Sequence, residues 1–113
     1  MTWEDVARAG LVLPEVEEAT SYGTPALRLR GKLLVRLRDD GETLALRVDP
    51  EERLALVHEQ PEIFYVTPHY QDYPFVLVRL AAADRGEPEE LLAEAWLLSA
   101  PKRLAAAHPE VAG

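Results

Sequence analysis

The 113-residue sequence contains no cysteine, only two lysines and no long apolar run. The absence of cysteine excludes disulfides, thiolate nucleophiles and cysteine-ligated metals, and it suits a reducing compartment. No apolar run approaches the ~18 residues that a membrane-spanning helix needs, and the N-terminus is acidic where a signal peptide would be basic. We therefore expect one cytoplasmic domain over residues 1–113, without a membrane segment and with a loose tail over 105–113.

The usual sequence motifs of enzymes are also missing. There is no glycine-rich nucleotide loop, no nucleophile elbow and no zinc-binding His-Glu-x-x-His, and the six glycines are scattered at turns. His58, His69 and His108 fall in three different predicted elements, which argues against a zinc site. The paired carboxylates stand at turns and helix starts, where solvation and capping account for them. The sequence predicts a protein that is not an enzyme and that has no metal and no cofactor.

Positive charge is scarce overall but concentrated in one place. Twenty acidic residues against twelve basic ones give a net charge of −8, which opposes general binding to nucleic acid. Residues 1–25 contain one basic and five acidic residues, for a net charge of −4. Residues 26–48 contain six basic and three acidic residues, for a net charge of +3, and residues 49–113 contain five basic and twelve acidic residues, for a net charge of −7. A basic island therefore lies between two acidic flanks. The excess of arginine over lysine is consistent with a GC-rich genome or with a thermophilic host.

Hydrophobic periodicity predicts an α+β fold. Thr2 and Asp5 resemble a capping box for a first helix that ends near Pro14. After a turn-rich connector over residues 21–25, apolar and polar residues alternate in three runs within residues 26–48, which indicates an antiparallel meander. Asp49 caps a second helix that runs to about Gln60. Two short apolar strands, residues 63–66 and 75–80, precede a last helix that begins near Pro88 and is interrupted at residue 101.

The predicted order is α-β-β-β-α-β-β-α, with the helices packed on one face of the sheet. The other face would be polar and basic, because side chains alternate across a strand. Its expected arginines are Arg28, Arg30, Arg36, Arg38 and Arg47.

Two interpretations of this basic face remain open. Its guanidinium groups would bind phosphates, with Tyr70 and Tyr73 of the loop over residues 67–74 stacking on bases beside them. Alternatively, the face is an ordinary solvated sheet surface balanced by acids, Phe64 and Phe75 pack in the core, and the tyrosines cover the sheet edge.

Four sequence fragments, in order, resemble the MmcQ/YjbR family. They are Tyr22-Gly23-Thr24-Pro25-Ala26 leading into Arg30-Gly31-Lys32, then Val48-Asp49-Pro50-Glu51, then Phe64-Tyr65-Val66-Thr67-Pro68-His69-Tyr70, and Ala100-Pro101-Lys102-Arg103. The resemblance spans nearly the whole chain. It implies a compact α+β fold similar to that of secretion chaperones and a DNA-binding role. It also implies a candidate surface comprising Tyr22, Thr24, Lys32, Thr67, Pro68, His69, Lys102 and Arg103.

Three hypotheses follow. The first is a DNA-binding, regulatory protein that contacts phosphates with a basic sheet face and binds in a strongly salt-sensitive way. The second is a protein-interaction module or homodimer, which uses exposed apolar residues or sheet edges and has no nucleic-acid role. The third is a small-ligand binder with the His69-Tyr70 loop over a pocket. In the first hypothesis the phosphate contacts come from Arg28, Arg30, Lys32, Arg36, Arg38 and Arg47, with Tyr70 beside them.

Overall fold

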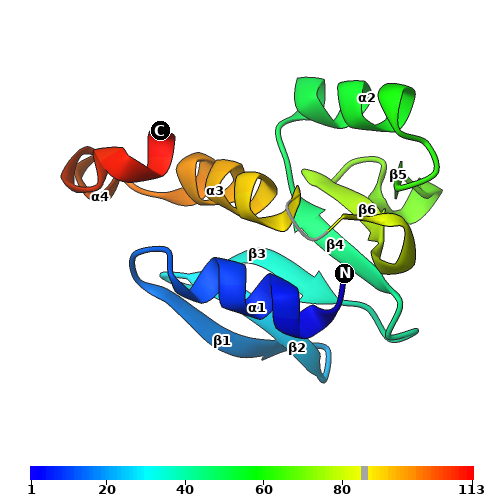
Figure 1. Cartoon of the computed structure of the whole chain (residues 1–113), viewed down its shortest axis with the longest axis horizontal. Helices are drawn as coiled ribbons and strands as arrows, with labels where there is room; N and C mark the ends of the chain where they lie inside the picture. Colours follow the sequence, from blue (N-terminus) through cyan, green and yellow to red (C-terminus); the bar gives the residue numbers. More distant parts are fainter. Residues whose placement is uncertain (85–86) are drawn as a thin grey trace.

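Six antiparallel strands form one sheet in the computed structural model, which describes residues 1–84 and 87–113 (Figure 1). Their order across the sheet is β1-β2-β3-β4-β6-β5. Strands β2 to β4 are the predicted meander, and β5 and β6 are the two predicted short strands, so the α+β fold class is confirmed. The strands are β1 (Val16–Ser21), β2 (Thr24–Leu29), β3 (Lys32–Leu37), β4 (Thr43–Arg47), β5 (Phe64–Tyr65) and β6 (Phe75–Arg79).

Strand β1 was not predicted, and it corrects the expected order of elements. Residues 16–20 were assigned to no helix or strand, and the predicted connector began at residue 21, because Glu17 and Glu18 interrupt the alternation of apolar and polar residues. Both glutamates are exposed, which an edge strand tolerates because it has a neighbour on one side only. The segment over residues 21–25 is therefore a hairpin between two strands and does not join a helix to the sheet.

Both hairpins that flank β2 turn through two residues with positive φ. Tyr22 and Gly23 have φ of 54° and 80°, and Arg30 and Gly31 have φ of 48° and 85°. Two left-handed residues in succession are typical of type I′ turns, whose twist matches that of paired strands. Glycine adopts this conformation freely, whereas a tyrosine or an arginine does so at a cost. The tight turns fix the register of β1, β2 and β3.

A β-bulge in β3 changes the predicted alternation. The pairing of β2 with β3 shifts between Leu27, which faces Val35, and Arg28, which faces Leu33. Leu34 is the additional residue, and both Leu34 and Val35 belong to the buried core. Because the additional residue shifts the alternation of faces by one position, Leu33 before the bulge shares the opposite face with Arg36 after it instead of pointing into the core.

The helices begin where the sequence predicts. Thr2 Oγ1 accepts the Asp5 backbone N–H at 3.2 Å and the Asp5 carboxylate accepts the Thr2 N–H at 3.0 Å, which completes the capping box. The Asp49 carboxylate accepts the N–H of Glu51 at 3.1 Å. None of the helices in the described ranges is long and apolar enough to cross a bilayer. The helices are α1 (Trp3–Leu11), α2 (Pro50–Glu59), α3 (Glu87–Ser99) and α4 (Lys102–Ala107), with 3-10 turns η1 (Pro68–Tyr70), η2 (Leu80–Ala82) and η3 (Pro109–Ala112).

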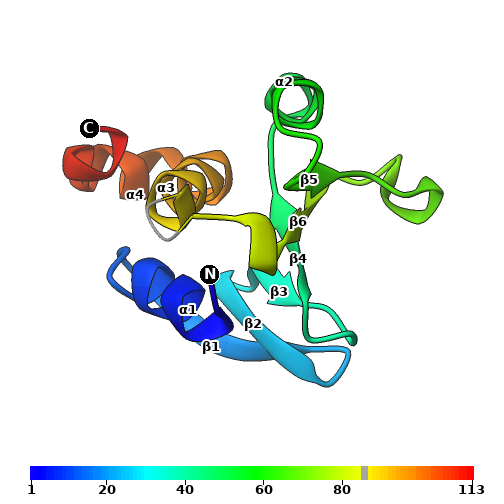
Figure 2. The same ribbon diagram turned by 45° about the vertical axis from the view of Figure 1, so that its right-hand side comes forward.

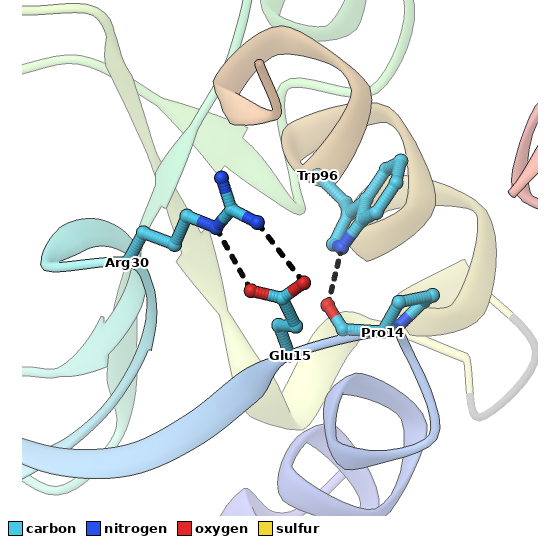
Figure 3. Close-up of polar contacts among 4 residues, drawn as sticks. All are labelled: Pro14, Glu15, Arg30 and Trp96. Carbon is cyan, nitrogen blue, oxygen red and sulfur yellow. Dashed lines mark hydrogen bonds and ion pairs between the residues drawn. The ribbon is translucent and has the colours of Figure 1, made fainter. Parts of the chain in front are cut away.

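Helices α1 and α3 lie side by side over β1 to β3, while α2 stands beyond β4 and β6 (Figure 2). The core between helices and sheet contains the large buried side chains, with Trp96 of α3 fully buried. The Trp96 indole Nε1–H donates to the carbonyl oxygen of Pro14 at 2.9 Å (Figure 3), which satisfies its only donor. This bond joins α3 to the loop between α1 and β1.

The C-terminal segment differs from the loose tail expected over residues 105–113. Helix α4 continues to Ala107, and η3 follows and contacts α3. Val111 packs against the core, and the His108 ring meets the Trp96 ring edge-on with centroids 6.3 Å apart. The sequence did not reveal this docking, because the apolar contact depends on a single valine after two short turns.

Candidate nucleic-acid interface

The sheet face turned away from α1 and α3, here called the outer face, carries a row of residues from every strand. Side chains that pair across neighbouring strands lie on the same face. The strand registers therefore place Arg36 between two alanines and continue the row to the far edge of the sheet. The row runs Ala19, Ala26, Arg36, Ala45, Leu77 and Tyr65.

Small side chains at the centre of this row leave room for a shallow groove of about 240 Å³. Ala26 and Ala45 are both buried and do not project above the sheet. Side chains from β3, from the β1–β2 turn and from the loop over residues 67–74 stand around them. We call this site the aromatic groove; it is lined by Tyr22, Leu33, Arg36, Ala45, His69, Tyr70, Tyr73 and Phe75.

Four arginines of the outer face stack on aromatic rings. The guanidinium carbon lies 5.3 Å from the ring centroid in the Arg36–Tyr22 and Arg38–Tyr70 pairs, 4.9 Å in Arg47–Phe75 and 4.1 Å in Arg79–Tyr65. Such cation–π contacts hold the flat guanidinium parallel or close to the ring and leave its edge able to donate hydrogen bonds. The predicted basic face is thus also an aromatic one.

Arg36 has a structural role within this face. It is only 8% exposed, and its Nη1 donates to Thr24 Oγ1 at 3.1 Å and to the Ser21 carbonyl at 3.4 Å. The Thr24 hydroxyl donates to the same Ser21 carbonyl at 2.8 Å. Arg36 therefore secures the β1–β2 turn, which holds the Tyr22 ring at the rim of the groove with 89% of its surface exposed.

The loop over residues 67–74, here called the η1 loop, is held against the sheet by an arginine that was not among the predicted site residues. Arg53 of α2 donates from Nη1 to the carbonyls of Tyr70, Tyr73 and Phe75 at 2.8 to 3.2 Å, and from Nη2 to the carbonyl of Gln71 at 3.0 Å. One guanidinium thus replaces the regular hydrogen bonding that the loop lacks. Its position in the first turn of α2 carried no signal in the sequence that linked it to the loop.

The remaining polar groups of the outer face are partly paired. Arg47 Nε donates to the Leu33 carbonyl at 2.7 Å, and burial lowers the pKa of Arg47. Backbone N–H groups, foremost that of Glu42, hold the pKa of Asp40 below its usual value, and the nearby charge of Arg38 adds to this effect. His69 lies against Tyr70 and Tyr73 with ring centroids 5.2 and 6.0 Å apart. In residues 1–84 and 87–113, no three histidine, aspartate or glutamate side chains gather as metal ligands.

Several predicted site residues lie outside the groove. Arg30 forms a two-pronged ion pair with Glu15, at 2.8 and 3.1 Å, near the Trp96 end of the molecule (Figure 3), and the pair lowers the pKa of Glu15. Arg28 donates to the Gly31 carbonyl within its own turn at 2.9 Å, and Lys32 is exposed at the start of β3. Lys102 and Arg103 are exposed on α4, at the opposite end of the molecule from the η1 loop (Figure 2).

The structure therefore brings together only part of the predicted surface and adds residues to it. Thr67 precedes η1 and is half-buried, and Pro68 is exposed in that turn. Phe64 lies in the core as the alternative interpretation expected, but Phe75 lies on the outer face under Arg47. Arg79 and Tyr65 were missed because their strands looked buried on both sides, although the alternation of Phe75, Leu77 and Arg79 marks one face.

Comparison with known proteins gives a family and a fold. The YjbR family model matches residues 11–98. Two mycobacterial proteins described as uncharacterized, Mb2600 of Mycobacterium bovis and Rv2570 of Mycobacterium tuberculosis, are each 35% identical over 118 aligned residues, covering 91% of this chain and 92% of the relative. The crystal structure of Deinococcus radiodurans protein DR2400, with family domain DUF419, matches with a TM-score of 0.75 and 22% identity, covering 98% of this chain and 88% of that one. That likeness shows the fold, and the sequence match shows that the chain belongs to the YjbR family.

Proposed function

We propose that this chain is a non-enzymatic DNA-binding protein that uses the outer face of its sheet and prefers single-stranded over duplex DNA. The observation that supports the proposal is the interleaving of arginines with aromatic rings around the aromatic groove. None of the eight described residues that line this groove is acidic. A phosphate backbone can therefore approach this face without meeting a carboxylate in the groove itself.

The exposed rings suit unpaired bases. Tyr22 is 89% and Tyr73 is 54% exposed, so each offers a ring surface on which a base can stack. Stacking of a base on an aromatic side chain contributes about 1–3 kcal/mol and tolerates any sequence. Bases in a duplex already stack on one another, so only the single strand gains this contact. The guanidinium groups of Arg38, Arg47 and Arg79 would bind phosphates beside the stacked bases.

The net charge of −8 weakens such binding without abolishing it. The molecule measures 36 × 29 × 27 Å along its principal axes, while charges are screened over about 10 Å at 0.1 M salt. Acidic residues on the helix side therefore act weakly on a strand bound to the outer face. The contacts within the groove determine the affinity at physiological salt.

The groove's shape separates this proposal from the small-ligand hypothesis. Sites that enclose a small molecule usually measure about 300–1,000 Å³, whereas the aromatic groove measures about 240 Å³ and is open to solvent. An open groove fits part of a longer chain better than it fits a ligand that must be surrounded.

The test is a fluorescence-anisotropy titration with labelled single-stranded and duplex DNA of one sequence, at about 50 and 200 mM salt. We expect tighter binding of the single strand and a steep loss of affinity at the higher salt. Tyr73→Ser and Arg38→Gln should weaken binding, because the first removes a stacking ring of the groove and the second removes the cation that stacks on the groove residue Tyr70. Arg103→Gln on α4 is the matched control and should leave the affinity unchanged. Absence of binding at low salt, or equal losses in all three variants, would contradict the proposal.

A further inference from the structure

A second groove lies on the helix side of the sheet, between α2 and α3 above β4. It measures about 330 Å³. Leu46 and Val48 form its buried floor, and Leu91, Leu97 and Leu98 of α3 form one wall. Leu46 belongs to β4, the strand whose Ala45 lines the aromatic groove, and Val48 follows that strand. Neighbouring residues of a strand face opposite sides of the sheet, so the two grooves lie on opposite faces. We call this site the α2–α3 groove.

The apolar wall of this groove is incompletely covered. Leu97 is 37% exposed and Leu98 is 48% exposed, although both line the groove beside its buried floor. Leu91 and Leu98 are two helical turns apart on the same side of α3, so the wall extends for about 10 Å along the helix. A trough of this length suits consecutive side chains of a peptide segment better than it suits a compact small molecule.

The rim of the groove is acidic. Asp49, Glu52 of α2 and Glu94 of α3 line it, and Asp49 is already engaged as the N-cap of α2. Arg47 also borders the groove, but its guanidinium stacks over Phe75 on the outer face. Within the part of the chain that the structure describes, no basic side chain forms an ion pair with Glu52 or Glu94.

The electrostatics of Glu94 are those of an acid that lacks a cation. Burial raises the pKa of Glu94, and the negative charges of Glu52 and Glu90 raise it further. Each of these effects disfavours the charged carboxylate. An incoming ammonium or guanidinium group would reverse them, because an opposite charge nearby favours the ionised form.

We propose that the α2–α3 groove docks a basic amphipathic segment of a partner protein, which places apolar side chains against Leu91 and Leu98 and a lysine or arginine beside Glu52 and Glu94. The combination of an apolar floor and an unbalanced acidic rim determines this occupant. A neutral apolar segment would leave the carboxylates desolvated without compensation. A second copy of this chain, with its net charge of −8, would add further negative charge to the interface.

The test uses a labelled synthetic peptide of leucine and lysine, with leucines at i, i+3, i+4 and i+7 spacing, titrated against the full chain by fluorescence anisotropy. Two further peptides control for each component: one replaces lysine by glutamate, and the other replaces leucine by serine. We expect binding of the leucine–lysine peptide alone, because the site requires both an apolar anchor and a cation.

Four variants of the chain locate the binding. Glu94→Gln and Leu98→Ser change exposed side chains that line the groove, and each should weaken binding about tenfold, the effect of losing about 1.4 kcal/mol. Glu59→Gln and Leu54→Ser are the matched controls, because both residues are exposed on α2 and neither lines the groove. Circular dichroism verifies that all four variants fold.

Several outcomes would overturn the proposal. Equal weakening by Glu94→Gln and Glu59→Gln would mean that lysines bind anywhere on an acidic surface. Equal binding of the serine–lysine peptide would mean that the apolar wall plays no part. A dimer in sedimentation equilibrium that Leu98→Ser dissociates would assign the groove to a second copy of the chain. None of these results depends on whether the outer face binds DNA.

Discussion

The aromatic groove and the α2–α3 groove lie on opposite sides of strand β4 and differ in charge. Ala45 lines the first, while Leu46 and Val48 line the second. The aromatic groove is surrounded by arginines stacked on rings and has no carboxylate among its described lining residues, whereas three carboxylates line the α2–α3 groove. The net charge of −8 is therefore the sum over surfaces of opposite charge. It does not predict what either groove binds.

The two grooves also differ in how their charges are paired. Cations of the outer face rest on aromatic rings and, at Arg36 and Arg47, on backbone carbonyls. In the α2–α3 groove, burial and then the negative charges of Glu52 and Glu90 raise the pKa of Glu94. A surface whose charges are compensated is stable without a ligand, whereas one with uncompensated charge gains more from binding one.

The largest effect should follow from loosening the η1 loop, which removes one side of the aromatic groove. Arg53→Leu deletes the donor to four loop carbonyls, and hydrogen bonds to a charged group contribute about 1.5–3 kcal/mol each when buried. Because the loop is partly solvated, we expect the free energy of unfolding to fall by about 2–3 kcal/mol in urea denaturation. Arg103→Leu serves as the control, and an unchanged stability would contradict the role assigned to Arg53.

Charge reversal of Arg38 on the outer face should reduce the difference in charge between the two grooves and weaken DNA binding. Arg38→Glu replaces a half-buried cation at Tyr70 with an anion, so we expect single-stranded DNA affinity to fall by at least about tenfold at low salt. The slope of log affinity against log salt should become shallower by about 1, because one phosphate contact is lost. The same substitution should not alter binding of the leucine–lysine peptide. Parallel titrations of both probes check this independence.

Neutralising Glu94 should stabilise the isolated chain slightly. Its pKa is raised in the folded state, so the folded protein binds more protons than the unfolded one between the two pKa values. Stability therefore falls as pH rises through that window, and the charge of Glu94 opposes folding at neutral pH. Because Glu94 is largely exposed, we expect Glu94→Gln to raise the free energy of unfolding by only a few tenths of a kcal/mol.

The pH dependence separates this effect from a general change in packing. The gain from Glu94→Gln should disappear below the window, where wild-type Glu94 is protonated in both states. The negative charges of Glu52 and Glu90 also act on the Glu94 carboxylate, so Glu59→Gln, a neutralisation elsewhere on the acidic surface, provides the baseline. Urea denaturation at a series of pH values measures the difference, and a gain that persists in acid would contradict the electrostatic origin.

The smallest effect should come from Arg30, a predicted DNA contact that the structure pairs with Glu15. Arg30→Gln should leave DNA binding unchanged, since the Arg30 guanidinium is already paired with the Glu15 carboxylate and stacks on none of the described rings of the outer face. The pair lowers the pKa of Glu15, so its small stabilisation is present above the unfolded pKa and is lost as pH falls through the folded one. Thermal melts at neutral and acidic pH measure it. A clear loss of DNA affinity would instead extend the interface to this end of the sheet.

The sequence predicted most of the fold because its local signals agree with one another. Capping at Thr2 and Asp49, alternation in β2 to β4 and the proline at residue 101 each act within a few residues. Strand β1 was missed because Glu17 and Glu18 are an edge strand's solvent-facing residues and have no periodic apolar partners. The bulge at Leu34 depends on the register of two strands, which composition does not encode.

The candidate site was only half predictable for a similar reason. Alternation correctly placed Arg36 and Arg47 on one face. It could not show that the Arg36 guanidinium donates its hydrogen bonds to the β1–β2 turn. The link between Arg53 and the η1 loop joins residues 17 to 22 positions apart, and nothing local signals it. Arg30 looked equivalent to its neighbours until Glu15 was seen beside it. The hydrogen bonds and ion pairs of the folded chain determine which arginines remain free to bind a ligand.

The edges of the sheet restrict how this chain can associate. Strand β5 is two residues long, and β1 carries the exposed glutamates 17 and 18. A short edge offers few free backbone groups to an added strand, and adjacent like charges on an edge repel a second copy of themselves. Growth by strand addition, the route to fibrils and to swapped oligomers, is thus disfavoured at both ends of the sheet. Concentrated solutions of the chain should remain free of strand-stacked aggregates, and any assembly must use side chains on its two faces.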